Sequence, residues 1–274
     1  MLNRSLETLG LATVPAKEPL SYPGRPITAP SLLDDGSLLE LTVGHGPVET
    51  WEVLTEQGPV PLDAHLAVRG AAPLRERHAA VSVGSNASPA QLNNKLVSRG
   101  LQGTVPMVPV RAYGLAIGMC AHIYPAGYVA TAPYADKRSE LTLVTTWLDD
   151  DQLKAVDETE IPFYERVLLP GDAFPMRLPH GEMLKEVHLY TSAMGVLAGP
   201  GGTPRPAQAE QAALLEDLLA ASAPLRAILG PDPLTWVERA STQPELREKG
   251  TRIFQEEGWV LMVDDFTQYA VGHS

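Results

Sequence analysis

Short apolar runs separated by turn residues dominate the middle of the chain, and this pattern predicts a set of β-strands. The first run, residues 78–83, has the length of a buried strand and is followed by Gly84. The later strand candidates, in chain order, are residues 108–118, 127–134, 141–148, 164–169 and 186–192. The centre of the chain is therefore predicted to be rich in β-structure.

A helix is predicted directly after the first of these strands. Ser88 has a typical N-cap side chain, a proline follows it at the first helical position, and Gln91 stands three residues after the cap. This combination is typical of a helix start. We expect the helix to run to about Ser98, with Gly100 just beyond its end. The predicted order is strand, tight loop and helix N-terminus.

A second helix is predicted over about residues 150–160. Asp149 is its expected N-cap, and Pro162 should end it because the residue before a proline is pushed out of the helical region. The apolar stripe of this helix includes Leu153, and Glu160 lies seven residues further along the same stripe. Glu160 is therefore predicted to be partly buried.

The two ends of the chain follow other patterns. Residues 1–36 are rich in proline and predict an extended arm, whereas residues 38–54 predict two short strands around a turn. Residues 59–77 predict a proline-rich connection to the centre, and residues 199–206 a flexible one. The elements expected beyond this point are helices within 207–229 and 245–257 and a strand within 259–266.

Composition and charge narrow the classes of function. The 274-residue chain has a formal charge of -12, which argues against nucleic acid as a partner because a phosphate backbone needs a basic surface. Its single cysteine, Cys120, cannot form an internal disulfide and suits a reducing compartment. No run approaches the roughly 20 apolar residues that a membrane span needs, and the first residues lack the apolar region of a signal peptide. We therefore expect a cytoplasmic protein with no membrane partner.

Potential metal ligands are not grouped along the chain. The seven histidines include no H-E-x-x-H motif and no paired zinc spacing. Cys120 and His122 share one face of a predicted strand, but two ligands do not make a metal site. We expect neither a metal ion nor an organic cofactor.

The loop formed by Gly84, Ser85 and Asn86 is the first feature that could carry chemistry. A glycine after a buried strand lets the backbone turn sharply and present successive N–H groups. The helix that follows adds unpaired N–H groups and the positive end of its dipole. Such a site suits a carboxylate or a developing oxyanion. The alternative is an ordinary strand-to-helix turn with a polar loop.

The carboxyl group of Glu160 is the second such feature. A carboxyl group that is partly buried in the last turn of a helix is a candidate proton carrier. The alternative is a frayed helix end whose glutamate is turned to solvent.

Taken in their order along the chain, these features resemble the γ-glutamyl cyclotransferase family. Residues 81–86 are similar to the family's (V/A)-Y-G-S-N loop, and the A-T pair at 130–131 to a strand containing G-x-A-T. Glu160 aligns with the family's catalytic glutamate, and Tyr190 is similar to a strand tyrosine that lies beside the substrate. The resemblance covers residues 78–192.

The resemblance implies an α+β fold, a small mixed β-barrel with flanking helices. We expect an N-terminal arm and a C-terminal helical extension beside this core, because residues 1–77 and those from about 206 have no counterpart in the family pattern. The resemblance divides the chain into an N-terminal extension that packs on the core (1–77), a γ-glutamyl-cyclotransferase-like core (78–198) and a mostly helical C-terminal extension (199–274). We expect the C-terminal extension to be part of the same globule.

A reaction and roles for residues follow from the resemblance as well. A γ-glutamyl amine or peptide would cyclise within one molecule to 5-oxoproline and release the amine, with Glu160 as the general acid/base. The implied substrate-binding residues are Val83, Gly84, Ser85, Asn86 and Tyr190. The implied reaction needs no cofactor, since well-oriented intramolecular attack reaches effective molarities of roughly 10⁵–10⁸ M.

One residue of the loop departs from the family pattern. Val83 stands where the family has a tyrosine, which removes a ring and a hydroxyl from the edge of the pocket. Two further functions therefore stay open. One is a non-catalytic small-molecule-binding or interaction module on the same fold, and the other is a tailoring enzyme for a γ-glutamylated metabolite.

Overall fold

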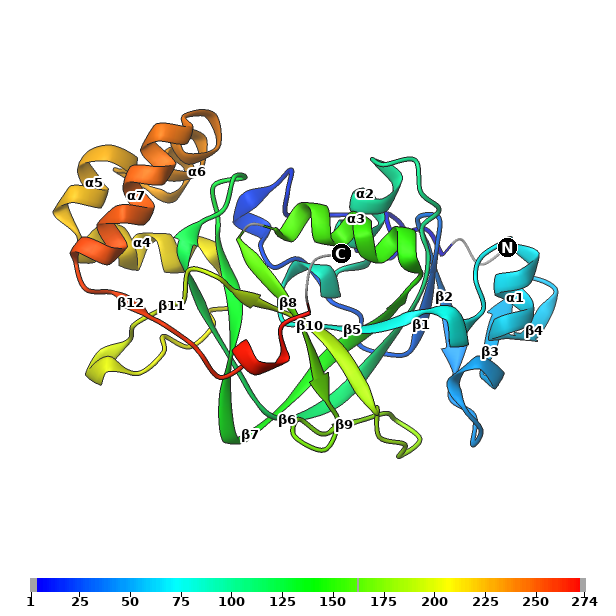
Figure 1. Cartoon of the computed structure of the whole chain (residues 1–274). Helices are drawn as coiled ribbons and strands as arrows, with labels where there is room; N and C mark the ends of the chain where they lie inside the picture. Colours follow the sequence, from blue (N-terminus) through cyan, green and yellow to red (C-terminus); the bar gives the residue numbers. More distant parts are fainter. Residues whose placement is uncertain (1–3, 162, 272–274) are drawn as a thin grey trace.

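Two long antiparallel strands, β6 (Thr104–Ile123) and β7 (Val129–Leu148), form the spine of the structure (Figure 1). The structure is a computed structural model that describes residues 4–161 and 163–271. The three strands expected at 108–118, 127–134 and 141–148 are segments of this one hairpin. Prolines and Gly114, which has a φ of +80°, interrupt the apolar pattern, but the strands continue past them with a shift in register.

The sheet extends on both sides of this hairpin in the order β4-β3-β2-β1-β6-β7-β5-β10-β8. Neighbouring strands are antiparallel except for the parallel pair β5 and β10. The bounds of the flanking strands are β1 Ser31–Asp34, β2 Ser37–Thr42, β3 Glu52–Thr55, β4 Gly58–Pro61, β5 His78–Ser82, β8 Tyr164–Pro170 and β10 Glu186–Ser192. The expected α+β class is confirmed. The expected barrel is not, because within the described residues β4 and β8 are the two ends of an open sheet.

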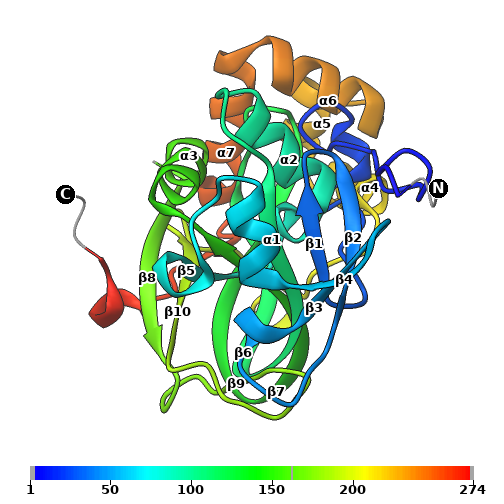
Figure 2. The same ribbon diagram turned by 90° about the vertical axis from the view of Figure 1, so that its right-hand side faces the viewer.

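The N-terminal segment contributes more regular structure than its proline content predicts. β1 lies within the expected arm and pairs with β6, so the first part of the chain continues the central sheet. Helix α1 (Leu62–Val68) lies within the expected proline-rich connection, and Leu62 and Leu66 bury its inner face. Figure 2 shows α1 and the strands β1 to β4 from the side.

Helices α2 (Pro89–Val97) and α3 (Asp150–Glu160) lie next to each other above the sheet (Figure 1). α3 begins as predicted, with a capping box between Asp149 and Gln152. Pro162, the residue expected to end it, lies outside the described residues. α2 begins after Ser88 as predicted, but the Ser88 side chain makes no cap hydrogen bond. Gln91 does not complete a capping box either, because its Oε1 accepts from the backbone N–H of Ala16, 3.1 Å away.

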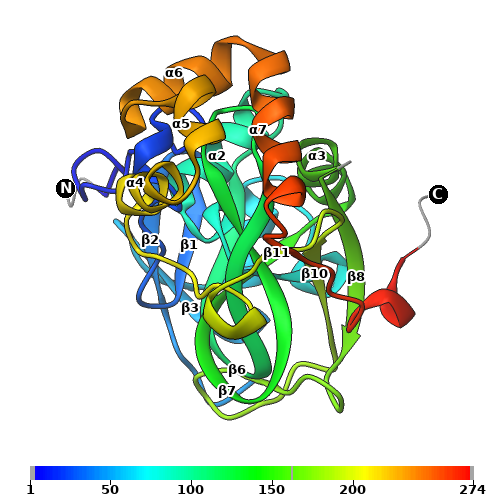
Figure 3. The same ribbon diagram turned by 90° about the vertical axis from the view of Figure 1, so that its left-hand side faces the viewer.

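The C-terminal helices cover one end of the β6–β7 hairpin (Figure 3). They are α4 Gln211–Ala221, α5 Ala223–Leu229, α6 Pro233–Thr242 and α7 Pro244–Glu256. Trp236 and Phe254 are fully buried in this cluster with Ile123 and Val129 of the hairpin. The strand expected at 259–266 is reduced to β12 (Val260–Leu261), which pairs with β11 (Val196–Leu197).

Short elements complete the described chain. β9 (Met176–Arg177) pairs with β6. The 3₁₀ turns are η1 Pro19–Ser21, η2 Val48–Thr50, η3 Leu74–Glu76, η4 Ser85–Ala87, η5 Pro200–Gly202 and η6 Thr267–Tyr269. In the part of the chain that the structure describes, no helix combines the length and apolar character needed to cross a membrane.

Candidate functional site

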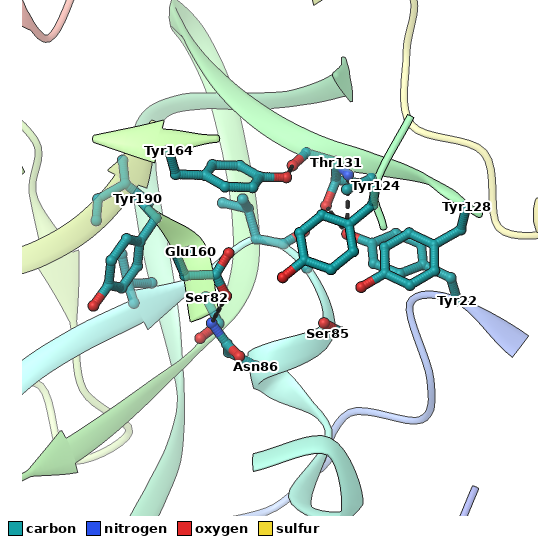
Figure 4. Close-up of a pocket in the computed structure, with 15 residues that line it drawn as sticks. Tyr22, Ser82, Ser85, Asn86, Tyr124, Tyr128, Thr131, Glu160, Tyr164 and Tyr190 are labelled. Carbon is teal, nitrogen blue, oxygen red and sulfur yellow. Dashed lines mark hydrogen bonds between the residues drawn. The ribbon is translucent and has the colours of Figure 1, made fainter. Parts of the chain in front are cut away.

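One pocket lies at the point where β5 ends, beneath the last turn of α3 (Figure 4). All six residues predicted from the sequence line it, namely Val83, Gly84, Ser85, Asn86, Glu160 and Tyr190. Val83 and Gly84 lie between β5 and η4, Ser85 and Asn86 belong to η4, α3 supplies the glutamate and β10 supplies the tyrosine. The centre of a water molecule can occupy about 40 Å³ of this pocket.

The two carboxylate oxygens of Glu160 have different surroundings. Oε1 accepts hydrogen bonds from Asn86 Nδ2 at 3.0 Å and from Lys95 Nζ at 2.5 Å. Oε2 has no hydrogen-bond donor among the described residues, and Figure 4 shows the second oxygen turned toward the tyrosines. The Oδ1 atom of Asn86 is also buried without a partner in the described part of the chain. The pocket thus offers Oε2 of Glu160 as an acceptor for a ligand that donates hydrogen bonds.

Lys95 is part of this site and was not predicted from the sequence. It lies on α2 between the buried residues Leu92 and Leu96, and 6% of its side chain is exposed. A buried ammonium needs a partner of opposite charge, and the carboxylate of Glu160 supplies it. The signal in the sequence was a lysine on the apolar stripe of a short helix.

Five of the chain's eight tyrosines line the pocket. Tyr22, Tyr128 and Tyr124 form a stack, with ring centroids 4.4 Å apart for the first two and 5.0 Å for the last two. Burial raises the pKa of all three phenols above the usual value, so their hydroxyls stay protonated. Tyr164 and Tyr190 complete the aromatic wall.

Tyr22 reaches the pocket from the N-terminal arm. The Tyr22 hydroxyl accepts a hydrogen bond from the N–H of Thr131 at 2.9 Å. The Thr131 hydroxyl donates to the Val83 carbonyl, so the Tyr22 hydroxyl is the donor in its 2.8 Å hydrogen bond to Thr131 Oγ1. A Cβ at Gly84 would lie 2.5 Å from the Tyr22 hydroxyl and 2.7 Å from Thr131 Oγ1. Only glycine fits there, and the arm is therefore one wall of the site.

Tyr190 offers the pocket its ring rather than its hydroxyl. The hydroxyl donates to Asp157 Oδ1 at 2.7 Å, and the same oxygen pairs with Arg166 Nε at 2.9 Å. Burial, together with the hydrogen bond to Asp157, raises the pKa of the Tyr190 phenol well above its usual value. This side chain is consequently a fixed apolar surface beside Glu160.

Cys120 and His122 lie behind the pocket and do not form a metal site. Burial raises the pKa of the Cys120 thiol to about 12, and the thiol donates to the Thr131 carbonyl at 3.2 Å. Burial lowers the pKa of His122 to about 4, and neither ring nitrogen has a partner among the described residues. No group of three His, Cys, Asp or Glu side chains within residues 4–161 and 163–271 could hold a metal ion.

Comparison with known proteins identifies likenesses in structure alone. No family model matches the chain, and no curated protein matches it. The solved structures that it resembles include a γ-glutamyl cyclotransferase, which is 11% identical with a TM-score of 0.35 over 43% of this chain and 68% of that chain. A protein from Arabidopsis thaliana is 15% identical with a TM-score of 0.34 over 57% of this chain and 95% of that one.

An uncharacterised protein from Homo sapiens is 12% identical with a TM-score of 0.34 over 43% of this chain and 68% of that chain. The family suspected from the sequence is thus represented among the similar structures. With TM-scores this low, these likenesses carry no argument about the reaction, for which the geometry of the pocket is the guide.

Proposed function

We propose that this protein cyclises a γ-glutamyl amine or peptide to 5-oxoproline and releases the amine. The observation that carries the proposal is the arrangement of the Glu160 carboxylate. Lys95 and Asn86 hold Oε1 by hydrogen bonds, while Oε2 faces the pocket and accepts no hydrogen bond from a described residue. A carboxylate held in this way has one oxygen in a set position for proton transfer. The resemblance of the Gly84–Asn86 loop to the same family adds to this support.

In the proposed reaction, the α-amine of the substrate attacks its own γ-carbonyl carbon. Oε2 of Glu160 takes a proton from the attacking ammonium, the new C–N bond closes the five-membered ring, and the old C–N bond breaks. The glutamate passes its proton to the leaving nitrogen. The attacking nitrogen loses a second proton during ring closure, and this proton departs with the amine as an ammonium ion.

The surroundings of Glu160 suit the ammonium group of such a substrate. Oε2 of Glu160 can accept from the ammonium before it is deprotonated. The tyrosine rings line the other side of the pocket, and a less polar surrounding strengthens this electrostatic contact. The backbone N–H groups near Ser85 are candidates to hold the substrate carboxylate or the oxyanion.

A second candidate function is a non-catalytic binding module on the same fold. The size of the pocket favours it, because Tyr22 of the arm occupies the corner beside Gly84 and the centre of a water molecule can occupy only about 40 Å³.

Incubation with a panel of γ-glutamyl amines and peptides separates the two functions. Release of 5-oxoproline by the native protein, with loss of release in Glu160→Gln, supports the enzyme. In this variant the amide oxygen can still accept from Lys95 and Asn86, so the pocket keeps its shape. Binding of panel members without release of 5-oxoproline would instead support the binding module.

A further inference from the structure

The five tyrosines that line the candidate site differ in the acceptors that their hydroxyl groups find. Four hydroxyls donate to the protein itself: Tyr22 to Thr131 Oγ1, Tyr124 to the Thr159 carbonyl at 2.6 Å, Tyr164 to the Thr131 carbonyl at 3.1 Å, and Tyr190 to Asp157. The hydroxyl of Tyr128 has one hydrogen-bonding neighbour among the described residues, the hydroxyl of Ser85. Tyr128 therefore stands apart from the other four.

Tyr128 and Ser85 together keep a proton for a ligand. Two hydroxyl groups in contact share one hydrogen bond, and neither makes another in the described part of the chain, so one of their two protons has no acceptor. Both residues line the pocket, and Figure 4 shows the Tyr128 hydroxyl turned into it, on the side where Ser85 lies. The ring of Tyr128 is held between those of Tyr22 and Tyr124 in the stack.

The pair suits a carbonyl oxygen better than a full negative charge. No lysine or arginine is among the described residues that line the pocket, and Lys95 is paired with Glu160. A carboxylate held by hydroxyls alone would lack a counter-charge. A carbonyl oxygen has no full charge at the start, and neutral donors aimed at it stabilise the charge that develops during an attack.

Tyr128 remains a donor throughout the accessible pH range. Burial raises the pKa of its phenol well above the usual value, and the carboxylate of Glu160 adds to the rise. The same electrostatic contact places the phenol near the group that takes the proton in the proposed reaction. A donor and a proton acceptor are thus present in one pocket.

We propose that the hydroxyl of Tyr128 donates a hydrogen bond to the γ-carbonyl oxygen of the substrate and stabilises the oxyanion that forms there. This inference rests on the proposed function. As the α-amine attacks, the electron pair of the C=O bond moves onto the oxygen, and it returns when the bond to the leaving nitrogen breaks. Tyr128 keeps its proton, Ser85 donates to the Tyr128 oxygen, and the proton transfers remain those of Glu160.

Tyr128→Phe is the direct test because it removes one oxygen atom and keeps the ring of the stack. For the panel member that the native protein converts fastest, we expect kcat to fall about 100-fold and KM to change by less than about three-fold, since the donor acts mainly in the transition state. Ser85→Ala should lower kcat less, because Tyr128 keeps its proton. Tyr134→Phe removes a hydroxyl of β7 outside the pocket and is the matched control, with both constants unchanged.

Stability separates a group that serves a ligand from one that holds the fold. Tyr124→Phe takes the donor from the Thr159 carbonyl and should lower the midpoint of denaturant unfolding. Tyr128→Phe should leave the midpoint close to the native value, because no carbonyl or carboxylate of the described chain loses a partner. A loss as large as that of Tyr124→Phe would overturn the proposal. An unchanged kcat, a rise in KM alone, or a larger fall in kcat for Ser85→Ala would overturn it as well.

Binding of 5-oxoproline keeps failure of the donor apart from failure of the reaction, because the lactam oxygen of this compound is the former γ-carbonyl oxygen. Calorimetry should show about two- to ten-fold weaker binding to Tyr128→Phe than to the native protein. Where the native protein releases no 5-oxoproline, this difference would support the donor and refute the cyclisation, whereas equal binding or no binding would overturn both. Release that depends on Glu160 but not on Tyr128 would support the cyclisation and overturn the donor.

Discussion

Replacement of Lys95 by methionine removes one member of a buried ion pair while keeping most of the length of the side chain. In the native protein 6% of the Lys95 side chain and 10% of the Glu160 side chain are exposed, and their charged atoms are 2.5 Å apart. Methionine would fill the space on α2 but leave the carboxylate with Asn86 as its remaining hydrogen-bond donor among the described residues.

The expected loss of stability is large because the carboxylate stays buried. Removing one partner of a buried ion pair costs about 3–5 kcal/mol. In a chain of this size that corresponds to a fall of about 6–20 °C in the midpoint of thermal unfolding, at about 2–4 °C per kcal/mol. Glu160→Gln should cost less, since the neutral amide can still accept from the lysine.

Denaturant unfolding of Lys95→Met, Glu160→Gln and the double variant measures the coupling between the two residues. We expect the double variant to be more stable than the sum of the single effects requires, because it no longer buries an unpaired carboxylate. Arg75→Met is the control, because the Arg75–Glu76 pair is mostly exposed and such pairs contribute about 1 kcal/mol or less. Additive single effects, or a Lys95→Met cost no larger than that of the control, would refute a buried ion pair at the site.

Three further outcomes follow from the contacts around the pocket. Gly84→Ala should destabilise the fold by about 1–3 kcal/mol because its Cβ would overlap the Tyr22 hydroxyl, and adding Tyr22→Phe should recover part of the loss in denaturant unfolding. His122 takes up a proton below about pH 6.5 in the unfolded chain but only below about pH 4 in the folded protein. As the pH falls from about 6.5 to about 4, the free energy of unfolding should therefore fall by about 3 kcal/mol relative to that of His122→Leu. Parallel profiles of stability against pH for the two proteins would contradict this. Tyr190→Phe removes a hydrogen bond to the charged Asp157 and should cost about 1.5–3 kcal/mol of stability. It should not abolish release of 5-oxoproline, and complete loss of activity in a folded variant would mean that the hydroxyl acts on the substrate.

The local features of the site were within reach of sequence reasoning. Helical periodicity placed Glu160 on the inner face of its helix, and the structure gives it 8% exposure. The strand, loop and helix around Gly84 were predicted from turn and cap preferences, which act over a few residues. These signals are short-range and do not depend on the rest of the fold.

The arrangement of the tyrosines depends on long-range contacts that no local pattern contains. Tyr22 meets Thr131 across 109 positions of sequence, and its neighbours in the arm give no periodic signal. Lys95 could have been found, because a lysine between two apolar helix positions calls for a buried acidic partner. Its pairing with Glu160, on a helix 65 positions away, still required the fold.

Helix α6 and the open sheet were not predicted from the sequence, for simpler reasons. Asp232 followed by a proline is a helix start of the kind recognised elsewhere in this chain, and it caps α6 through the Thr235 N–H. The open sheet arises because β1 to β4 extend it from β6 outward. No strand pattern predicts which edge of a sheet an extension will join.

The most direct test of the central claim is the rate of 5-oxoproline formation from a panel of γ-glutamyl amines and peptides by the native protein and by Glu160→Gln. The account predicts formation by the native protein and its loss in the variant, with both proteins folded. Equal rates in the two proteins would remove Glu160 from the reaction. No 5-oxoproline from any γ-glutamyl compound tested would contradict the proposed enzyme.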